Sequence, residues 1–169
     1  MLKSNAAAVA AVCSLAACGQ VNLQQAPAAP AAPATAAVRM TASTQTLAGG
    51  YRKVPAPAGA AAYFVNLKNG DVVSSPLLVQ FGLRGLGVAP AGIEKDNTGH
   101  HHLLIDVAEV DVNNALPATD NIRHFGGGQT EARIELKPGT HTLQLLLGDH
   151  NHIPHFPAVL SERITVTVK

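Results

Sequence analysis

The sequence predicts an all-β fold, a β-sandwich, that follows a disordered tether rich in alanine and proline. Residues 62–169 contain several short apolar stretches of strand length, separated by turn signals, and no convincing helical periodicity. Alanine and proline are concentrated in the first third of the chain, where proline interrupts both helices and strands. We therefore expect one folded domain, about 100 residues long, at the end of the tether.

Composition disfavours several classes of partner and site. The net charge is +1 and the chain has no run of lysine or arginine, so neither nucleic acid nor an anionic lipid surface is favoured electrostatically. The two cysteines, Cys13 and Cys18, both precede the predicted domain, which excludes a disulfide framework and a thiolate metal site within it.

Residues 1–17 are expected to be a lipoprotein signal peptide. Lys3 precedes an apolar run at 6–17, which has the length of a signal core and is shorter than a membrane span. The tetrapeptide Leu-Ala-Ala-Cys at 15–18 resembles the bacterial lipobox, where cleavage precedes a cysteine that becomes lipidated. We predict that lipid on Cys18 anchors the protein in the bacterial cell envelope, with its domain facing the periplasm. The alternative is an ordinary secretory signal with an incidental cysteine.

Residues 18–61 are expected to be the lipidated cysteine and a disordered linker. The segment is rich in Gln, Ala, Pro and Thr, and its prolines are spaced so that no helix or strand can propagate far. The folded domain, 62–169, is expected to begin at Ala62, where the pattern changes to the apolar sequence Tyr-Phe-Val.

The strands of the sandwich are expected in the following order. The first, starting at Ala62, leads into Asn69-Gly70, a dipeptide typical of tight turns. A strand with alternating inward apolar residues follows at 77–83, and then a Gly-rich loop. Further strands are expected at 100–107, 131–136, 141–147 and 163–168.

Two connections refine the expected fold. The turns around Asn69-Gly70 and Pro138-Gly139 resemble those of bacterial immunoglobulin-like and fibronectin type III modules. We therefore expect an immunoglobulin/fibronectin III-like β-sandwich, an architecture that hosts unrelated functions.

Histidines are confined to one part of the chain. All eight lie between His100 and His155, and the first 99 residues contain none. Alternation along the strand at 100–107 places His100 and His102 on one face and His101 on the face that forms the core. Imidazoles at positions i and i+2 of a strand are roughly 6–7 Å apart at their bases, which is close enough to share one ion.

Three separated histidine-bearing motifs resemble a bacterial family. They are Gly-His-His-His-Leu-Leu-Ile-Asp at 99–106, His-Phe-Gly-Gly-Gly-Gln-Thr-Glu-Ala at 124–132, and the run at 141–155 that ends in Gly-Asp-His-Asn-His-Ile-Pro-His. Together they are similar to the domain of unknown function 4399 (DUF4399), over roughly residues 62–169. The resemblance implies a secreted or lipid-anchored domain and no particular activity.

The strand order predicts that histidines converge at one end of the sandwich. The loop before His100 and the loop after residue 147 open at the same end, and the connection at 108–130 returns there. A metal ion, Cu(II) or Zn(II), suits imidazoles without thiolate, and the sequence does not separate the two metals. The candidate ligands are His100, His102, His124, His150, His152 and His155.

Structural roles are expected for four other residues. His101 is expected to be a hydrogen-bonded core or near-core residue, and His141 to brace the opposite corner of the sandwich. Asp106 and Asp149 are expected to cap turns or to orient imidazoles.

Three functions remain open at this point. The first is a lipid-anchored envelope module that binds a divalent transition metal, and the second is a structural or protein-interaction domain with an envelope protein as its partner. The third is a metal-assisted hydrolytic enzyme, although the chain lacks His-Glu-x-x-His, Gly-x-Ser-x-Gly and a phosphate-binding loop. Nothing in the sequence orients Ser161, His155 and Asp149 as a triad.

Overall fold

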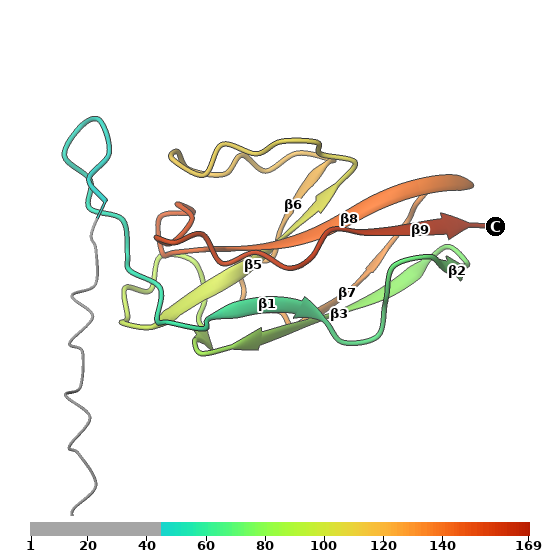
Figure 1. The fold of residues 1–169 in the computed structure, drawn as a ribbon, viewed down its shortest axis with the longest axis horizontal. Helices are drawn as coiled ribbons and strands as arrows, with labels where there is room; N and C mark the ends of the chain where they lie inside the picture. Colours follow the sequence, from blue (N-terminus) through green and yellow to red (C-terminus); the bar gives the residue numbers. More distant parts are fainter. Residues whose placement is uncertain (1–44) are drawn as a thin grey trace, which may run out of the picture. The chain divides into compact units, whose positions relative to one another are not determined.

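The computed structural model describes residues 45–169, and regular secondary structure in this part of the chain is entirely β. Two sheets pack face to face as a β-sandwich (Figure 1). The all-β sandwich is therefore confirmed, whereas the immunoglobulin or fibronectin III topology stays a prediction. Among the described residues, no helix has the length and hydropathy of a membrane span.

One sheet has three strands in the order β1-β3-β7, and the other has six, ordered β2-β9-β8-β5-β4 with β6 paired to β5. The strands are β1 (Ala61–Phe64), β2 (Asp71–Val73), β3 (Leu77–Arg84), β4 (Gly87–Val88), β5 (Thr98–Ile105), β6 (Ile122–His124), β7 (Glu131–Ile134), β8 (Gly139–Gly148) and β9 (Ile164–Val168).

The core lies between the sheets and is built by period-two alternation. Val79 and Phe81 of β3 face Leu103 of β5 and Leu145 of β8, and all four side chains are almost fully buried. Burying each such side chain contributes about 1.5–3 kcal/mol to stability. This packing fixes β5 and β8 as rigid central strands.

A second, smaller apolar cluster covers the outer face of the six-stranded sheet. Leu104 and Leu146 point outward from β5 and β8 and are buried by Leu116, which lies in the long connection between β5 and β6. The outer face of β5 is therefore covered as well as the inner one, and residues on that face at its other end, including His100 and His102, are also buried.

Three short strands, β2, β4 and β6, were not expected from the sequence. Each is two or three residues long, so it has no alternation that could be detected. β6 matters most because it places His124 directly opposite His102 in the antiparallel register with β5.

The segment 45–60, which we call the N-terminal arm, packs on the sandwich. Lys53 is only 1% exposed and its Nζ donates to the carbonyl of Val112 at 2.7 Å. The backbone amide of Ala56 donates to Phe156, and that of Phe156 donates to Val54. The expectation of a disordered linker reaching residue 61 is therefore wrong for residues 45–61, because backbone pairing and small side chains attach this segment without apolar periodicity. Cys18 and the other residues expected to form the signal and linker, 1–44, lie outside the described residues.

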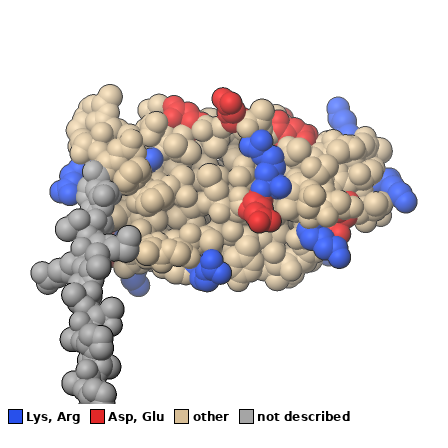
Figure 2. Space-filling model, viewed as in Figure 1, with Lys and Arg blue, Asp and Glu red and all other residues tan. Residues whose placement is uncertain are grey.

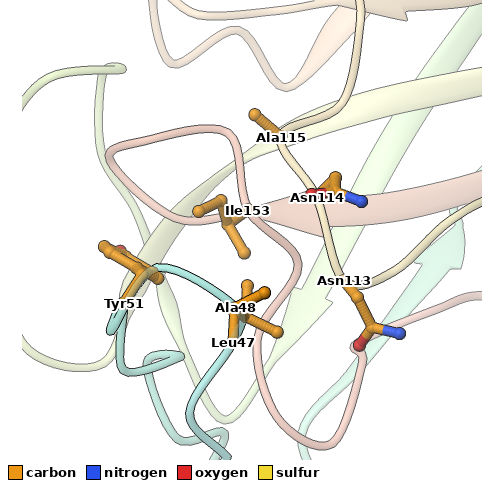
Figure 3. Close-up of a pocket in the computed structure, with 7 residues that line it drawn as sticks. All are labelled: Leu47, Ala48, Tyr51, Asn113, Asn114, Ala115 and Ile153. Atoms are coloured by element: carbon orange, nitrogen blue, oxygen red, sulfur yellow. The ribbon is translucent and has the colours of Figure 1, made fainter.

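The arm also borders a pocket of about 210 Å³ (Figure 3). Leu47, Ala48 and Tyr51 come from the arm, and the opposite walls are Asn113–Ala115 and Ile153. On the face shown in Figure 2, basic and acidic side chains are scattered, and neither sign forms a continuous patch.

Candidate metal centre

The floor of the candidate site is formed by two histidines of β5. His100 and His102 project from the outer face of the strand, are both 0% exposed, and have ring centroids 4.8 Å apart. Both residues are paired with β8, and His102 is also paired with β6 on the other side of β5, so neighbouring strands fix the backbone at both positions. The predicted i, i+2 pair on one strand face is therefore present.

Two further imidazoles close over this floor. The ring of His124 lies 5.2 Å from that of His102 and 5.0 Å from that of His100. His152, in the loop after β8, lies 5.0 Å from His100, 4.7 Å from His124 and 6.2 Å from His102. We call His100, His102, His124 and His152 the four-histidine cluster.

The ring nitrogens of the floor have no hydrogen-bond partner. Both nitrogens of His100 and both of His102 are buried and unpaired among the described residues. Buried polar groups are normally paired, and leaving one unpaired costs about 1–3 kcal/mol. A neutral imidazole has one nitrogen with a free lone pair. Each ring therefore offers one atom that can bind a metal ion and that nothing in the described chain uses.

The cluster has the dimensions of a metal site. One ring nitrogen from each of His100, His102 and His124 can be chosen so that all three lie within 4.8 Å of one another. A ring nitrogen about 2.0–2.1 Å from an ion puts the ring centre about 3.2 Å away, so four tetrahedral imidazoles have centres about 5.2 Å apart. The centroid distances in the cluster run from 4.7 to 6.2 Å and bracket this value.

Burial keeps the cluster uncharged. Desolvation, assisted by repulsion from neighbouring histidines, lowers the pKa of His100 to about 4 and that of His102 to about 3. Desolvation, and then His152, also lower the pKa of His124. The rings of His100 and His102 are therefore neutral at neutral pH, which is the form that binds a metal.

The loop that carries His152 is held by Asp149, as the expected turn cap. Oδ1 of Asp149 accepts from the amides of Asn151 at 2.8 Å and Ile153 at 3.0 Å, while Oδ2 accepts from the phenol of Tyr51 at 2.8 Å. This turn places His152 in the left-handed region with φ of 65°, a conformation uncommon for residues other than glycine. Such backbone outliers occur preferentially at functional sites.

Two glycines leave room for the rings. A Cβ on Gly148 would lie 2.8 Å from Cε1 of His102, and a Cβ on Gly126 would overlap the ring of His124. Neither glycine was among the expected site residues, although the Gly-Gly-Gly run at 126–128 is a visible signal for close approach of backbone and side chain.

Two predicted ligands lie outside the cluster. His155 is buried and donates from Nε2 to the carbonyl of Thr98 at 3.1 Å, and its ring lies against Gly99, on the face of β5 that His101 occupies. Nε2 of His150 lies 2.9 Å from the Asn151 amide nitrogen. The structure therefore brings together four of the six predicted ligands and leaves His150 and His155 apart from them.

The remaining histidines have structural surroundings. His101 faces the core against Phe81, with ring centroids 5.3 Å apart, but its ring nitrogens have no hydrogen-bond partner, so the expected hydrogen bond is absent from the described chain. Burial lowers the pKa of His101 to about 4. His141 contacts Asp106 at 2.7 Å and donates to the carbonyl of Lys137 at 2.9 Å, as expected for a corner brace.

A model of the family described as Domain of unknown function (DUF4399) matches residues 79–169. The matched region contains the whole four-histidine cluster together with Gly126 and Gly148, and it begins after the N-terminal arm. Comparisons with curated proteins and with solved structures gave no match.

Proposed function

The chain belongs to the DUF4399 family, a domain of unknown function, and from the geometry of its site we propose that it is a binding module for one divalent transition-metal ion, Cu(II) or Zn(II). The observation that carries this proposal is the pair of buried, unpaired imidazoles at His100 and His102, which face two more imidazoles. A bound ion would satisfy lone pairs that the described chain leaves unused.

Each residue of the four-histidine cluster has a distinct role in this proposal. His100 and His102 are the rigid ligands from the central strand β5. His124 is the third ligand, presented across the strand pair, and His152 is the fourth, presented by the loop that Asp149 holds. Imidazole suits copper and zinc, whereas calcium and magnesium prefer several oxygen ligands.

The proposal includes a location in the bacterial cell envelope. A lipid on Cys18 would anchor the module to the membrane, and the Leu-Ala-Ala-Cys sequence at 15–18 supports this. Replacing Cys18 with Ala and fractionating cells tests the anchor. Loss of the protein from the membrane fraction supports lipidation, and an unchanged membrane level contradicts it.

Metal binding is tested by titrating Cu(II) or Zn(II) into the full mature chain, purified without metal. One ion should bind and should raise the melting temperature by mass action. The double variant His102→Ala with His124→Ala should lose both effects, whereas the matched variant His150→Ala with His155→Ala should keep an ion-dependent rise. If no ion binds, or if the first variant binds as tightly as the parent, a purely structural or protein-interaction domain is favoured instead.

A further inference from the structure

The four-histidine cluster supplies ligands but no negative charge. The group of side chains that can share one ion consists of histidines alone, without an aspartate or glutamate, in the part of the chain that the structure describes. Neutral imidazoles leave the two charges of a divalent ion uncompensated. Because His100 and His102 are fully buried, this charge lies where an unpaired ion is costly.

The negative charge of Asp149 offsets only part of this charge. Asp149 interacts electrostatically with His100, but it interacts with the buried ammonium of Lys53 as well. Its oxygens are already occupied by the amides of Asn151 and Ile153 and by the phenol of Tyr51. Lys53 interacts with Asp111 as well as with Asp149, so the two carboxylates and the ammonium together offset no more than one of the ion's two charges.

The site is open on the side away from β5. His124 is exposed and His152 is half-buried, while the floor formed by His100 and His102 is closed. The ring of His152 is also the one that lies furthest from a floor residue, 6.2 Å from His102. An ion bound by the four-histidine cluster can therefore take one more ligand at a solvent-facing position beside His124 and His152.

We propose that the metal-loaded site takes a small monovalent anion as an exogenous ligand at this solvent-facing position. The inference rests on the proposed function and adds the chemical class of the ligand. The anion neutralises part of the charge that the four-histidine cluster leaves uncompensated. Hydroxide, azide and short carboxylates belong to this class.

The test uses the full mature chain loaded with less than one equivalent of Cu(II), freed of unbound copper, and titrated with azide. We expect a saturable azide-to-copper charge-transfer absorption and a matching change in the electron paramagnetic resonance spectrum. If copper is bound but azide leaves both spectra unchanged, the anion site does not exist while the metal-binding proposal stands. If copper is not bound, both proposals fall.

Two variants at one position separate charge from shape. Asp and Asn both tolerate the left-handed backbone at residue 152 and differ by one negative charge. Both variants should still hold copper through the three remaining imidazoles, more weakly than the parent does. Azide should bind to His152→Asn at least as tightly as to the parent, whereas it should bind about tenfold more weakly, or not at all, to His152→Asp, which brings its own negative charge. Equal azide affinity in these two variants, with copper retained in both, would overturn the charge argument.

Discussion

The phenol of Tyr51 donates a 2.8 Å hydrogen bond to Asp149 and so joins the N-terminal arm to the loop that carries His152. Asp149 is the residue that holds this loop, through the amides of Asn151 and Ile153. Burial, more than any other cause, raises the pKa of Tyr51 to about 12, so the phenol remains a donor throughout the physiological pH range. A segment that resembles a linker therefore helps to position a candidate metal ligand.

Removal of the N-terminal arm should destabilise the domain. A truncated protein beginning at Ala61 loses the buried Lys53, the backbone pairing with Phe156 and the Tyr51 hydrogen bond. Several lost contacts of this kind should lower the free energy of unfolding by about 2–4 kcal/mol. Urea denaturation measures this against a second truncated protein that begins at residue 45 and keeps the arm. Equal stability of the two truncated proteins would show that the arm contributes nothing.

The Tyr51 hydroxyl should affect metal binding as well as stability. Tyr51→Phe removes the part-buried hydrogen bond to the Asp149 carboxylate, which costs about 1.5–3 kcal/mol, together with the 3.3 Å hydrogen bond that the hydroxyl accepts from Asn151, and so loosens the loop around His152. Metal affinity, measured by competition with a chelator, should fall several-fold. The matched variant is Tyr63→Phe, at an exposed tyrosine of β1, and it should change neither quantity appreciably. Identical metal affinities in the two variants would show that Tyr51 does not position His152.

Acid should destabilise the metal-free domain. The folded pKa values of His100, His101 and His102 are about 4, 4 and 3, below the ordinary 6.5. Between pH 6.5 and 4 the unfolded chain binds protons that the folded chain does not, so the free energy of unfolding falls as the pH falls. Each of the three groups contributes on the order of 1.4 kcal/mol for each pH unit between its unfolded and folded pKa, so the loss at pH 4.5 should reach several kcal/mol. Urea denaturation at pH 7 and pH 4.5 measures it, and equal stability at the two pH values would contradict the burial of these rings.

Protonation of His141 should affect the free energy of unfolding in the opposite direction. Its hydrogen bond to Asp106 raises its pKa, so its stabilising contribution is complete at low pH and is lost as pH rises through the raised pKa. The loss of stability at pH 4.5 is therefore the sum of one stabilising contribution, from His141, and of destabilising contributions from the five histidines whose pKa is lowered, His100, His101, His102, His124 and His155. The variant His141→Gln should lose more stability at pH 4.5 than at pH 8, which separates the two contributions.

The glycine that accommodates His124 should be needed for the site and not for the fold. Gly126→Ala places a methyl group where the His124 ring lies, so that ring must move away from the cluster. Metal affinity should fall about tenfold or more, since one of three or four ligands is displaced. At Gly127 a methyl group would meet only the flexible end of Gln129, so Gly127→Ala is the matched control. Titration of both variants with Zn(II) measures the difference, and equal affinity would show that His124 is not a ligand.

The sequence was sufficient to predict the long strands, and it also predicted that His100 and His102 share one face of their strand. Alternation in β5 correctly separates His100 and His102 from His101, because one face of that strand must be apolar. His124 was expected to approach the site from a loop, but it arrives on β6, a strand defined only by its pairing with β5. Pairing of this kind depends on tertiary contacts and leaves no periodic signal.

Residues outside the periodic strands were the hardest to place. His150, His152 and His155 lie within six positions of one another, and the sequence alone does not distinguish them. The left-handed backbone at His152 and the hydrogen bond of His155 to Thr98 separate them in space. The roles of Tyr51 and Lys53 depend on partners about a hundred and about sixty positions away in the chain, so local patterns could not indicate them.

X-ray absorption spectroscopy of the metal-loaded full mature chain tests the central claim most directly, because it identifies the atoms bound to the ion. We predict a coordination sphere with three or four imidazole nitrogens at about 2.0–2.1 Å, reduced by one imidazole in His124→Ala and unchanged in His150→Ala. An ion held by oxygen ligands alone, or a coordination sphere that is the same in both variants, would contradict a metal centre at the four-histidine cluster.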